Sequence, residues 1–135
     1  MAAPARGKVL LVDDDPDSLK LASVRVTQAG YEVLPAGDGA AALAIAKSQH
    51  PDVILLDVVM PGMDGYQVLR LLKADAATAD IPVVMLTSKA SDKDMATSLG
   101  LGSMRHMVKP PNPKELAEEI ALAVERHRFH HKPAA

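Results

Sequence analysis

Short apolar runs alternate with longer amphipathic segments along the chain. Residues 8–12, apolar from Val9 onward, and residues 53–56 form short runs that lead directly into carboxylates. Such runs are typical of strands buried on both faces of a parallel sheet. Strands are also predicted at residues 31–35, 81–86 and 103–108. The pattern therefore predicts five strands, although the last carries the polar Arg105 and His106.

Helix signals fill the gaps between these strands. Asp38 is expected to cap a helix over residues 40–49, and Asp64 with Gln67 matches a capping box. Asn112, Pro113 and Glu115 fit the N-cap, N1 and N3 positions of a last helix. The remaining helices are predicted from Pro16 to Gly30 and over residues 91–99, and residues 75–80 form a loop.

Five strand–helix pairs in strict alternation predict an α/β fold with a parallel sheet and helices on both faces. The length of 135 residues suits a single domain. We expect that domain to span residues 8–125. Residues 1–7 are expected to form a disordered leader. Residues 126–135 are expected to form a basic, His-rich C-terminal tail, either a solvated helix end that frays or a binding site for an anionic partner or a metal.

Composition narrows the class of protein. The chain is 48% hydrophobic but only 2% aromatic, so aliphatic residues and methionine must fill the core. Cysteine is absent, which excludes disulfides and thiolate metal sites and suits a reducing compartment. No apolar run approaches the roughly 20 residues of a membrane span. We therefore expect a cytoplasmic protein without membrane insertion.

Charge is distributed unevenly around a net value of −2. Of the 15 Lys and Arg residues, three lie in residues 126–135, which leaves 12 basic against 17 acidic side chains in residues 1–125. The body of the protein is therefore acidic and does not resemble a nucleic-acid binder. We expect no direct DNA binding.

Polar residues collect where the predicted strands end. They are Asp13 and Asp14 after the first strand, Asp57 after the third, Thr87 after the fourth and Lys109 after the fifth. All strands of a parallel sheet end at one edge, and ligands bind there. If the sheet places the first, third, fourth and fifth strands side by side, these residues share one pocket. Spacing along the chain does not show that order.

Such a pocket suits phosphoryl transfer. Three close carboxylates repel one another. Mg²⁺ binds carboxylate, water and phosphate oxygens, and its charge offsets this repulsion. Lys109 and the Thr87 hydroxyl suit phosphoryl oxygens, which leaves Asp57 free to attack. Each residue also has a structural alternative: Asp14 as a helix-start acid, Thr87 as a strand-end hydroxyl, and Lys109 as a solvated surface lysine.

Four sequence blocks carry a family resemblance. They are Val12-Asp13-Asp14, Leu56-Asp57-Val58-Val59-Met60-Pro61-Gly62-Met63-Asp64-Gly65, Leu86-Thr87-Ser88 and Val108-Lys109-Pro110. Their order, each at a strand exit, resembles the receiver domain of two-component response regulators, of the stand-alone, chemotaxis-type single-domain kind. The resemblance covers about residues 8–124.

The resemblance implies a flavodoxin-like (βα)5 three-layer sandwich with sheet order 2-1-3-4-5. It implies that Asp57 accepts a phosphoryl group from a sensor histidine kinase or histidine phosphotransfer protein. Mg²⁺ would be held by Asp13, Asp14, Asp57 and the Val59 main-chain carbonyl, with Thr87 and Lys109 on the phosphoryl oxygens. Such a protein is not an enzyme with a separate substrate; it assists its own phosphorylation and dephosphorylation.

Signal output is expected through protein contacts. The resemblance places the target on the face of the fourth helix, fifth strand and last helix, with a possible phosphorylation-dependent dimer. Family members often have a switching aromatic residue three positions before the lysine, where this chain has His106. Either His106 replaces that switch, or it is an exposed histidine on an edge strand without a switching role.

Two other functions remain open. Asp13 and Asp15 form the D-x-D pair of small phosphohydrolases with an aspartate nucleophile, although Asp17 stands where that family has Thr or Val. A receiver that has lost phosphorylation and acts only as a docking module is the other alternative.

Overall fold

One five-stranded parallel sheet forms the centre of the molecule. The computed structural model describes residues 6–87, 96, 99–109 and 111–130. The strands are β1 (Lys8–Val12), β2 (Glu32–Ala36), β3 (Val53–Asp57), β4 (Val83–Thr87) and β5 (Arg105–Val108). They lie in the order β2-β1-β3-β4-β5, and every pair is parallel. The predicted α/β, flavodoxin-like fold with sheet order 2-1-3-4-5 is confirmed.

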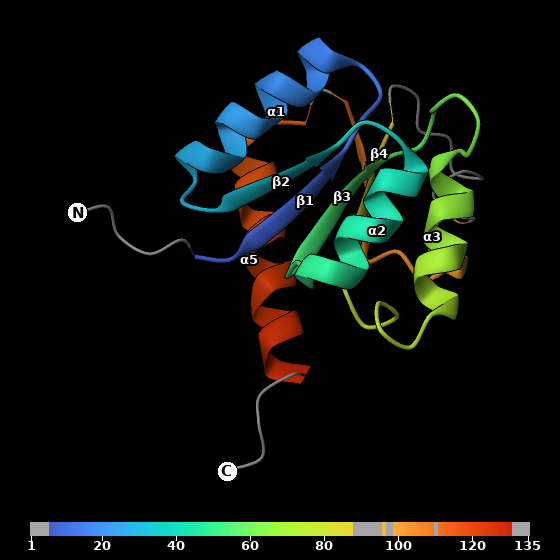
Figure 1. The fold of residues 1–135 in the computed structure, drawn as a ribbon. Helices are drawn as coiled ribbons and strands as arrows, with labels where there is room; N and C mark the ends of the chain where they lie inside the picture. The colour runs from blue at the N-terminus through green and yellow to red at the C-terminus, as the bar shows by residue number, and fades with distance from the viewer. Residues whose placement is uncertain (1–5, 88–95, 97–98, 110, 131–135) are drawn as a thin grey trace.

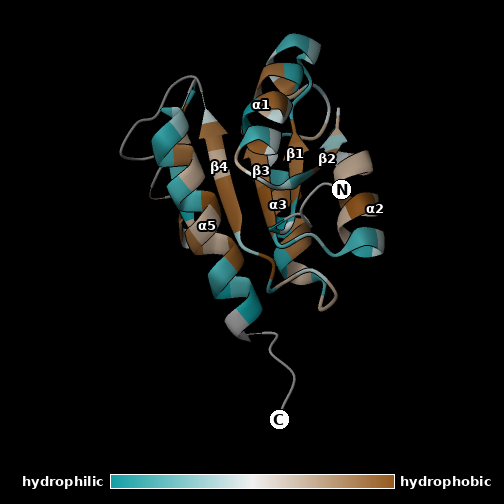
Figure 2. Ribbon diagram, turned by 90° about the vertical axis from the view of Figure 1, so that its left-hand side faces the viewer, coloured by the Kyte–Doolittle hydropathy of each residue, from teal (hydrophilic) through white to brown (hydrophobic). Residues whose placement is uncertain are grey.

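Helices cover both faces of this sheet (Figure 1). Those that the structure describes are α1 (Pro16–Gln28), α2 (Gly39–Gln49), α3 (Gly65–Ala74) and α5 (Pro113–His130). One core joins the sheet to α1 and α5 through residues such as Val26, Leu116 and Ile120. A second core joins the opposite face to α2 and α3, with Ala46 and Leu69 among its members. Apolar strands therefore lie between helices that alternate polar and apolar bands, as Figure 2 shows.

The predicted helix starts are confirmed by their capping contacts. The Asp38 carboxylate accepts from the Ala41 N–H at 2.7 Å, and Asp64 and Gln67 form both halves of a capping box. The Asn112 side-chain oxygen accepts from the N–H groups of Lys114 and Glu115 at 2.9 and 3.3 Å. Each contact satisfies a backbone donor that the first helical turn leaves unpaired.

Three strands begin later than predicted. The second strand begins at Glu32 because the Tyr31 N–H bonds to the Val26 carbonyl at the end of α1. The fourth begins at Val83 because the Ile81 N–H closes a turn onto Thr78. The fifth is shorter than residues 103–108, since the chain leaves a turn at Gly102 with φ of +102° before it joins the sheet.

The last helix continues to His130, beyond the predicted end of the domain at residue 125. Within the added turn, His127 Nδ1 lies 3.2 Å from Asp52 Oδ1, and the Arg128 guanidinium donates to the Arg6 carbonyl. Arg6 itself donates its N–H to the Gly30 carbonyl at 2.8 Å. Both ends of the described chain are therefore bonded to the domain. Residues 1–5 and 131–135 lie outside the described residues.

The predicted helix over residues 91–99 lies almost entirely outside the described residues. In the part that the structure describes, no helix is both long and apolar enough to cross a membrane.

Candidate functional site

The sheet order brings the predicted site residues to one edge. Asp57 is the last residue of β3 and Thr87 the last of β4, while Asp13 and Lys109 directly follow β1 and β5. β1, β3, β4 and β5 are neighbours in the sheet. The strand adjacency that the pocket requires is therefore present.

Lys109 connects two of the acids. Its Nζ lies 2.5 Å from Asp13 Oδ2 and 3.7 Å from Asp57 Oδ2. The main-chain N–H of Lys109 donates to the Thr87 carbonyl at 2.6 Å, which fixes the start of the side chain beside β4. Lys109 is consequently an ion-paired residue at the acidic cluster, and the alternative of a solvated surface lysine is wrong.

Three carboxylates meet around this ammonium group. One oxygen each from Asp13, Asp14 and Asp57 lies within 4.8 Å of the others. Asp13 and Asp57 are buried, whereas Asp14 is exposed. Three acids with one lysine leave an excess of negative charge, and hard divalent cations prefer oxygen ligands of this kind. The donor set therefore fits a divalent cation such as Mg²⁺.

The two buried acids have opposite pKa shifts. Burial raises the pKa of Asp57 to about 6; Lys109 opposes this shift, and the charges of Asp13 and Asp14 reinforce it. Burial also raises the pKa of Asp13, but hydrogen bonds from Lys109, the Asp15 N–H and Ser18 outweigh it and hold that pKa below its ordinary value. Of these two buried acids, Asp57 is thus the one less stabilised as an anion by the protein alone, and it gains more from a bound cation.

Val59 and Thr87 flank Asp57. The Val59 N–H donates to the Asp57 carboxylate, and the Val59 side chain is 69% exposed. Thr87 is buried, and in the sheet register it directly follows Leu86, the residue paired with Asp57. The main chain of Val59 therefore contacts the phosphoacceptor candidate, and Thr87 ends the neighbouring strand.

His106 is buried, with 5% of its surface exposed, so the alternative of an exposed edge-strand histidine is wrong. It pairs in register with Met85, two residues before Thr87. Because strand side chains alternate between faces, Met85 and Thr87 point to the same side of the sheet. His106 lies on this side of β5, opposite Met85, and Val108 is the residue paired with Thr87.

Two residues that contact Asp13 or Asp57 were not among the site residues predicted from the sequence. Ser18, in the first turn of α1, donates to Asp13. Gly65 begins α3, and a Cβ there would lie 2.3 Å from the Asp57 carbonyl oxygen. A small residue at N1 of the helix after Asp57 is the feature that could have identified Gly65.

Asp15 has a structural role. Its carboxylate accepts from the Asp17 N–H at 3.1 Å and caps α1, and its own N–H donates to Asp13 Oδ1 at 3.0 Å. The second acid of the D-x-D pair is therefore used at a helix start, outside the cluster of Asp13, Asp14 and Asp57.

The fold is similar to solved structures of a chemotaxis protein and of a receiver domain. The chain is 35% identical to the chemotaxis protein CheY4 of Vibrio cholerae, with a TM-score of 0.82 over 90% of this chain and 99% of that one. It is 28% identical to the receiver domain of the Francisella response regulator 1452, with a TM-score of 0.83 over 90% and 98% of the two chains.

Curated relatives are longer. The chain is 40% identical over 119 residues to the probable transcriptional regulator ycf27 of Cyanophora paradoxa, covering 88% of this chain and 48% of that protein. It is 35% identical over 122 residues to the DNA-binding response regulator MtrA of Mycolicibacterium smegmatis, covering 90% and 52%. The chain thus spans about half the length of these relatives. Their names give no support to the expectation that DNA binding is absent.

The model of the response regulator receiver domain matches residues 9–121, which include every residue of the acidic cluster and Lys109. The chain belongs to the receiver-domain family of two-component response regulators.

Proposed function

We propose that this chain is the phosphoacceptor of a two-component phosphorelay and that Asp57 is the residue phosphorylated. The supporting observation is the position of Asp57: it ends a fully buried strand, lies within 4.8 Å of two other acids and faces the Lys109 ammonium. The donor would be a phosphohistidine on a sensor kinase or phosphotransfer protein.

The transfer is a displacement at phosphorus. An Asp57 carboxylate oxygen forms the new O–P bond while the N–P bond of phosphohistidine breaks, and imidazole leaves with the electron pair. Mg²⁺, held by Asp13, Asp14, Asp57 and the Val59 carbonyl, would neutralise charge on the phosphoryl oxygens. The Lys109 ammonium, 3.7 Å from Asp57 Oδ2, is the proposed cation for one phosphoryl oxygen, and the Thr87 hydroxyl is the proposed donor to a further oxygen. The same groups would assist loss of the phosphoryl group to water.

Intact-protein mass spectrometry after incubation with Mg²⁺ and acetyl phosphate tests this proposal. We expect a mass increase of one phosphoryl group that is lost in Asp57→Asn. Asp15→Asn is the matched control, because Asp15 caps α1 and lies outside the cluster, and it should still be phosphorylated. An unmodified wild type, or equal modification of Asp57→Asn, would refute the assignment.

The phosphohydrolase alternative has weaker support, since Asp15 is engaged at the helix cap. The alternative of a docking module without phosphorylation is opposed by the complete set of three acids and a lysine. Steady release of phosphate from free phosphomonoesters would favour the hydrolase. Binding of a partner with equal affinity by Asp57→Asn and phosphorylated wild type would favour the docking module.

We also propose that His106 transmits the modification to the face of β5 and α5, where a target protein or a second copy of the chain would bind. Phosphorylation adds charge and acceptor oxygens that would draw Thr87 toward Asp57. His106 lies on the neighbouring strand, on the same face of the sheet, and pairs with Met85, two residues before Thr87. Arg105, on the same strand, pairs with Glu119 of α5 at 3.6 Å. A shift in β5 would therefore alter the exposed surface of both elements.

Amide chemical shifts before and after phosphorylation test the role of His106. In the wild type we expect changes at Asp57 and along β5. In His106→Ala the changes at Asp57 should persist, while those at Arg105 and Glu119 should fall to about half or less, because the coupling side chain is gone. His127→Ala, which removes a histidine bonded to Asp52, is the matched control. Full retention of the β5 changes in His106→Ala would exclude the switch.

A further inference from the structure

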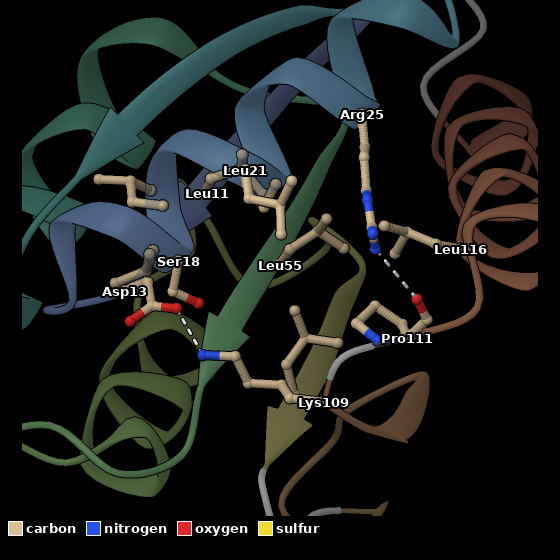
Figure 3. Close-up of a pocket in the computed structure, with 13 residues that line it drawn as sticks. Leu11, Asp13, Ser18, Leu21, Arg25, Leu55, Lys109, Pro111 and Leu116 are labelled. Atoms are coloured by element: carbon tan, nitrogen blue, oxygen red, sulfur yellow. Dashed lines mark hydrogen bonds and ion pairs between the residues drawn. The ribbon is translucent and has the colours of Figure 1, made fainter.

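An apolar cavity of about 320 Å³ lies between α1, the sheet and the start of α5 (Figure 3). Its floor is formed by Leu11, Leu55 and Leu86, from three neighbouring strands, and its walls include Leu19, Ala22 and Leu116. Leu11 and Leu55 precede Asp13 and Asp57 by two residues and therefore share their face of the sheet. The cavity adjoins the acidic site on the side nearer the starts of the strands. Most of the side chains that line it are apolar.

Of the charged side chains that line the cavity, Asp13 and Lys109 pair with each other, and Arg25 remains for an anionic ligand. Asp13 is neutralised by the Lys109 ammonium at 2.5 Å and accepts the Asp15 N–H. Arg25 reaches across the cavity mouth, where Nη1 lies 3.5 Å from the Pro111 carbonyl, as Figure 3 shows. Among the residues that the structure describes, Arg25 forms no ion pair with a carboxylate. The hydrogen bond from its guanidinium to the Pro111 carbonyl is at the long limit of the normal distance range.

We propose that this cavity binds a small apolar carboxylic acid, with the hydrocarbon body on the leucine floor and the carboxylate on Arg25. The volume is at the lower end of sites for small organic molecules, which suits a bicyclic aromatic or medium-chain acid. An anionic ligand is favoured because the Asp13 carboxylate already pairs with Lys109, whereas Arg25 pairs with no carboxylate in the described part of the chain. A carboxylate can accept two parallel hydrogen bonds from a guanidinium, which the single Pro111 carbonyl cannot match.

The proposal does not depend on phosphorylation of Asp57. Asp57 is not among the residues that line the cavity, so the acid should bind unmodified protein without Mg²⁺. It should also bind Asp57→Asn with unchanged affinity. Failure of the phosphorylation experiment and failure of this one are therefore separate results.

Methyl chemical shifts during titration with 1-naphthoate test the site. We expect saturable changes at Leu11, Leu55 and Leu116, with a dissociation constant below about 1 mM. In Arg25→Gln the affinity for naphthoate should fall about tenfold, which is the effect expected from losing one hydrogen bond to a charged group. The affinity for uncharged 1-naphthamide should stay the same. Lys20→Gln removes an exposed cation of α1 that does not line the cavity and should change neither affinity.

Filling the cavity provides an independent variant. Ala22→Leu places three more carbon atoms in the wall and should weaken both naphthoate and naphthamide about tenfold, provided that thermal unfolding confirms a folded protein. No leucine shift change up to the solubility limit would overturn the proposal. So would changes confined to Asp57 and Lys109, which would mean that the carboxylate competes for the acidic site. Equal naphthoate affinity in Arg25→Gln and wild type would also overturn it.

Discussion

Asp57→Asn is expected to stabilise the metal-free protein by about 2 kcal/mol at pH 7.5. Burial raises the pKa of Asp57 from 3.8 to about 6, so ionising this side chain in the folded state opposes folding. The difference between the two pKa values corresponds to about 3 kcal/mol. Burying the asparagine amide offsets part of that gain. Urea unfolding of both proteins in the presence of EDTA measures the effect.

The pH dependence identifies the cause. A carboxyl whose pKa is raised by folding binds more protons in the folded state than in the unfolded state, so this group stabilises the wild type as pH falls. The advantage of Asp57→Asn should therefore be complete above about pH 6 and should disappear as pH falls toward 3.8. The window between these two values is where the difference in unfolding free energy changes.

A matched variant and a metal titration complete the test. Asp14→Asn removes an exposed acid of the same cluster and should gain less than about 1 kcal/mol. Mg²⁺ should raise the stability of the wild type more than that of Asp57→Asn, because binding to the folded state alone stabilises it. Equal stability of wild type and Asp57→Asn at pH 7.5 without metal would show that Asp57 is not destabilised by its position.

The features that sequence reasoning predicted well are local. Unbroken apolar runs identified β1 and β3, and capping residues such as Asp38 and Asn112 located the starts of helices, because these signals lie within a few residues of their effect. The predicted first residues of the strands were less accurate. Tyr31 and Ile81 have β propensity, but a turn or a helix end uses their N–H groups, and only the folded chain shows that competition.

Contacts between distant segments were not predictable in the same way. The chemistry of Asp57 was inferred from residue types, but the strand order that brings Lys109 to Asp13, 96 residues away, came from family resemblance. The contact between His127 and Asp52, 75 residues apart, has no periodic or capping signature. The sequence also did not predict the cavity beside Arg25, because an unfilled volume depends on how α1 and α5 pack against the sheet.

Gly65→Ala is expected to destabilise the protein by about 3 kcal/mol, even though Gly65 is the first residue of a helix. Helix propensity alone predicts the opposite sign, a gain of about 1 kcal/mol for alanine. The added Cβ would lie 2.3 Å from the Asp57 carbonyl oxygen and 2.8 Å from the Val58 Cα. Both are backbone atoms that cannot rotate away, so the clash outweighs the propensity.

The same clash should slow phosphorylation. Relieving it requires the Asp57 main chain and α3 to separate by about 1 Å, and a displacement of that size at a reacting group typically costs about a hundredfold in rate. We therefore expect Gly65→Ala to be modified by acetyl phosphate about a hundredfold more slowly than wild type at a temperature where both are folded.

Gly37→Ala provides the matched control, because a Cβ at Gly37 meets no atom within 4 Å. Its stability should stay within about 1 kcal/mol of wild type, with an unchanged phosphorylation rate. If Gly65→Ala is as stable as Gly37→Ala and is phosphorylated as fast, the close approach of α3 does not position Asp57. If it is destabilised but phosphorylated normally, the close packing serves stability alone. A joint loss of stability and rate, absent from Gly37→Ala, is the result expected if a glycine at this helix start holds the phosphoacceptor loop in place.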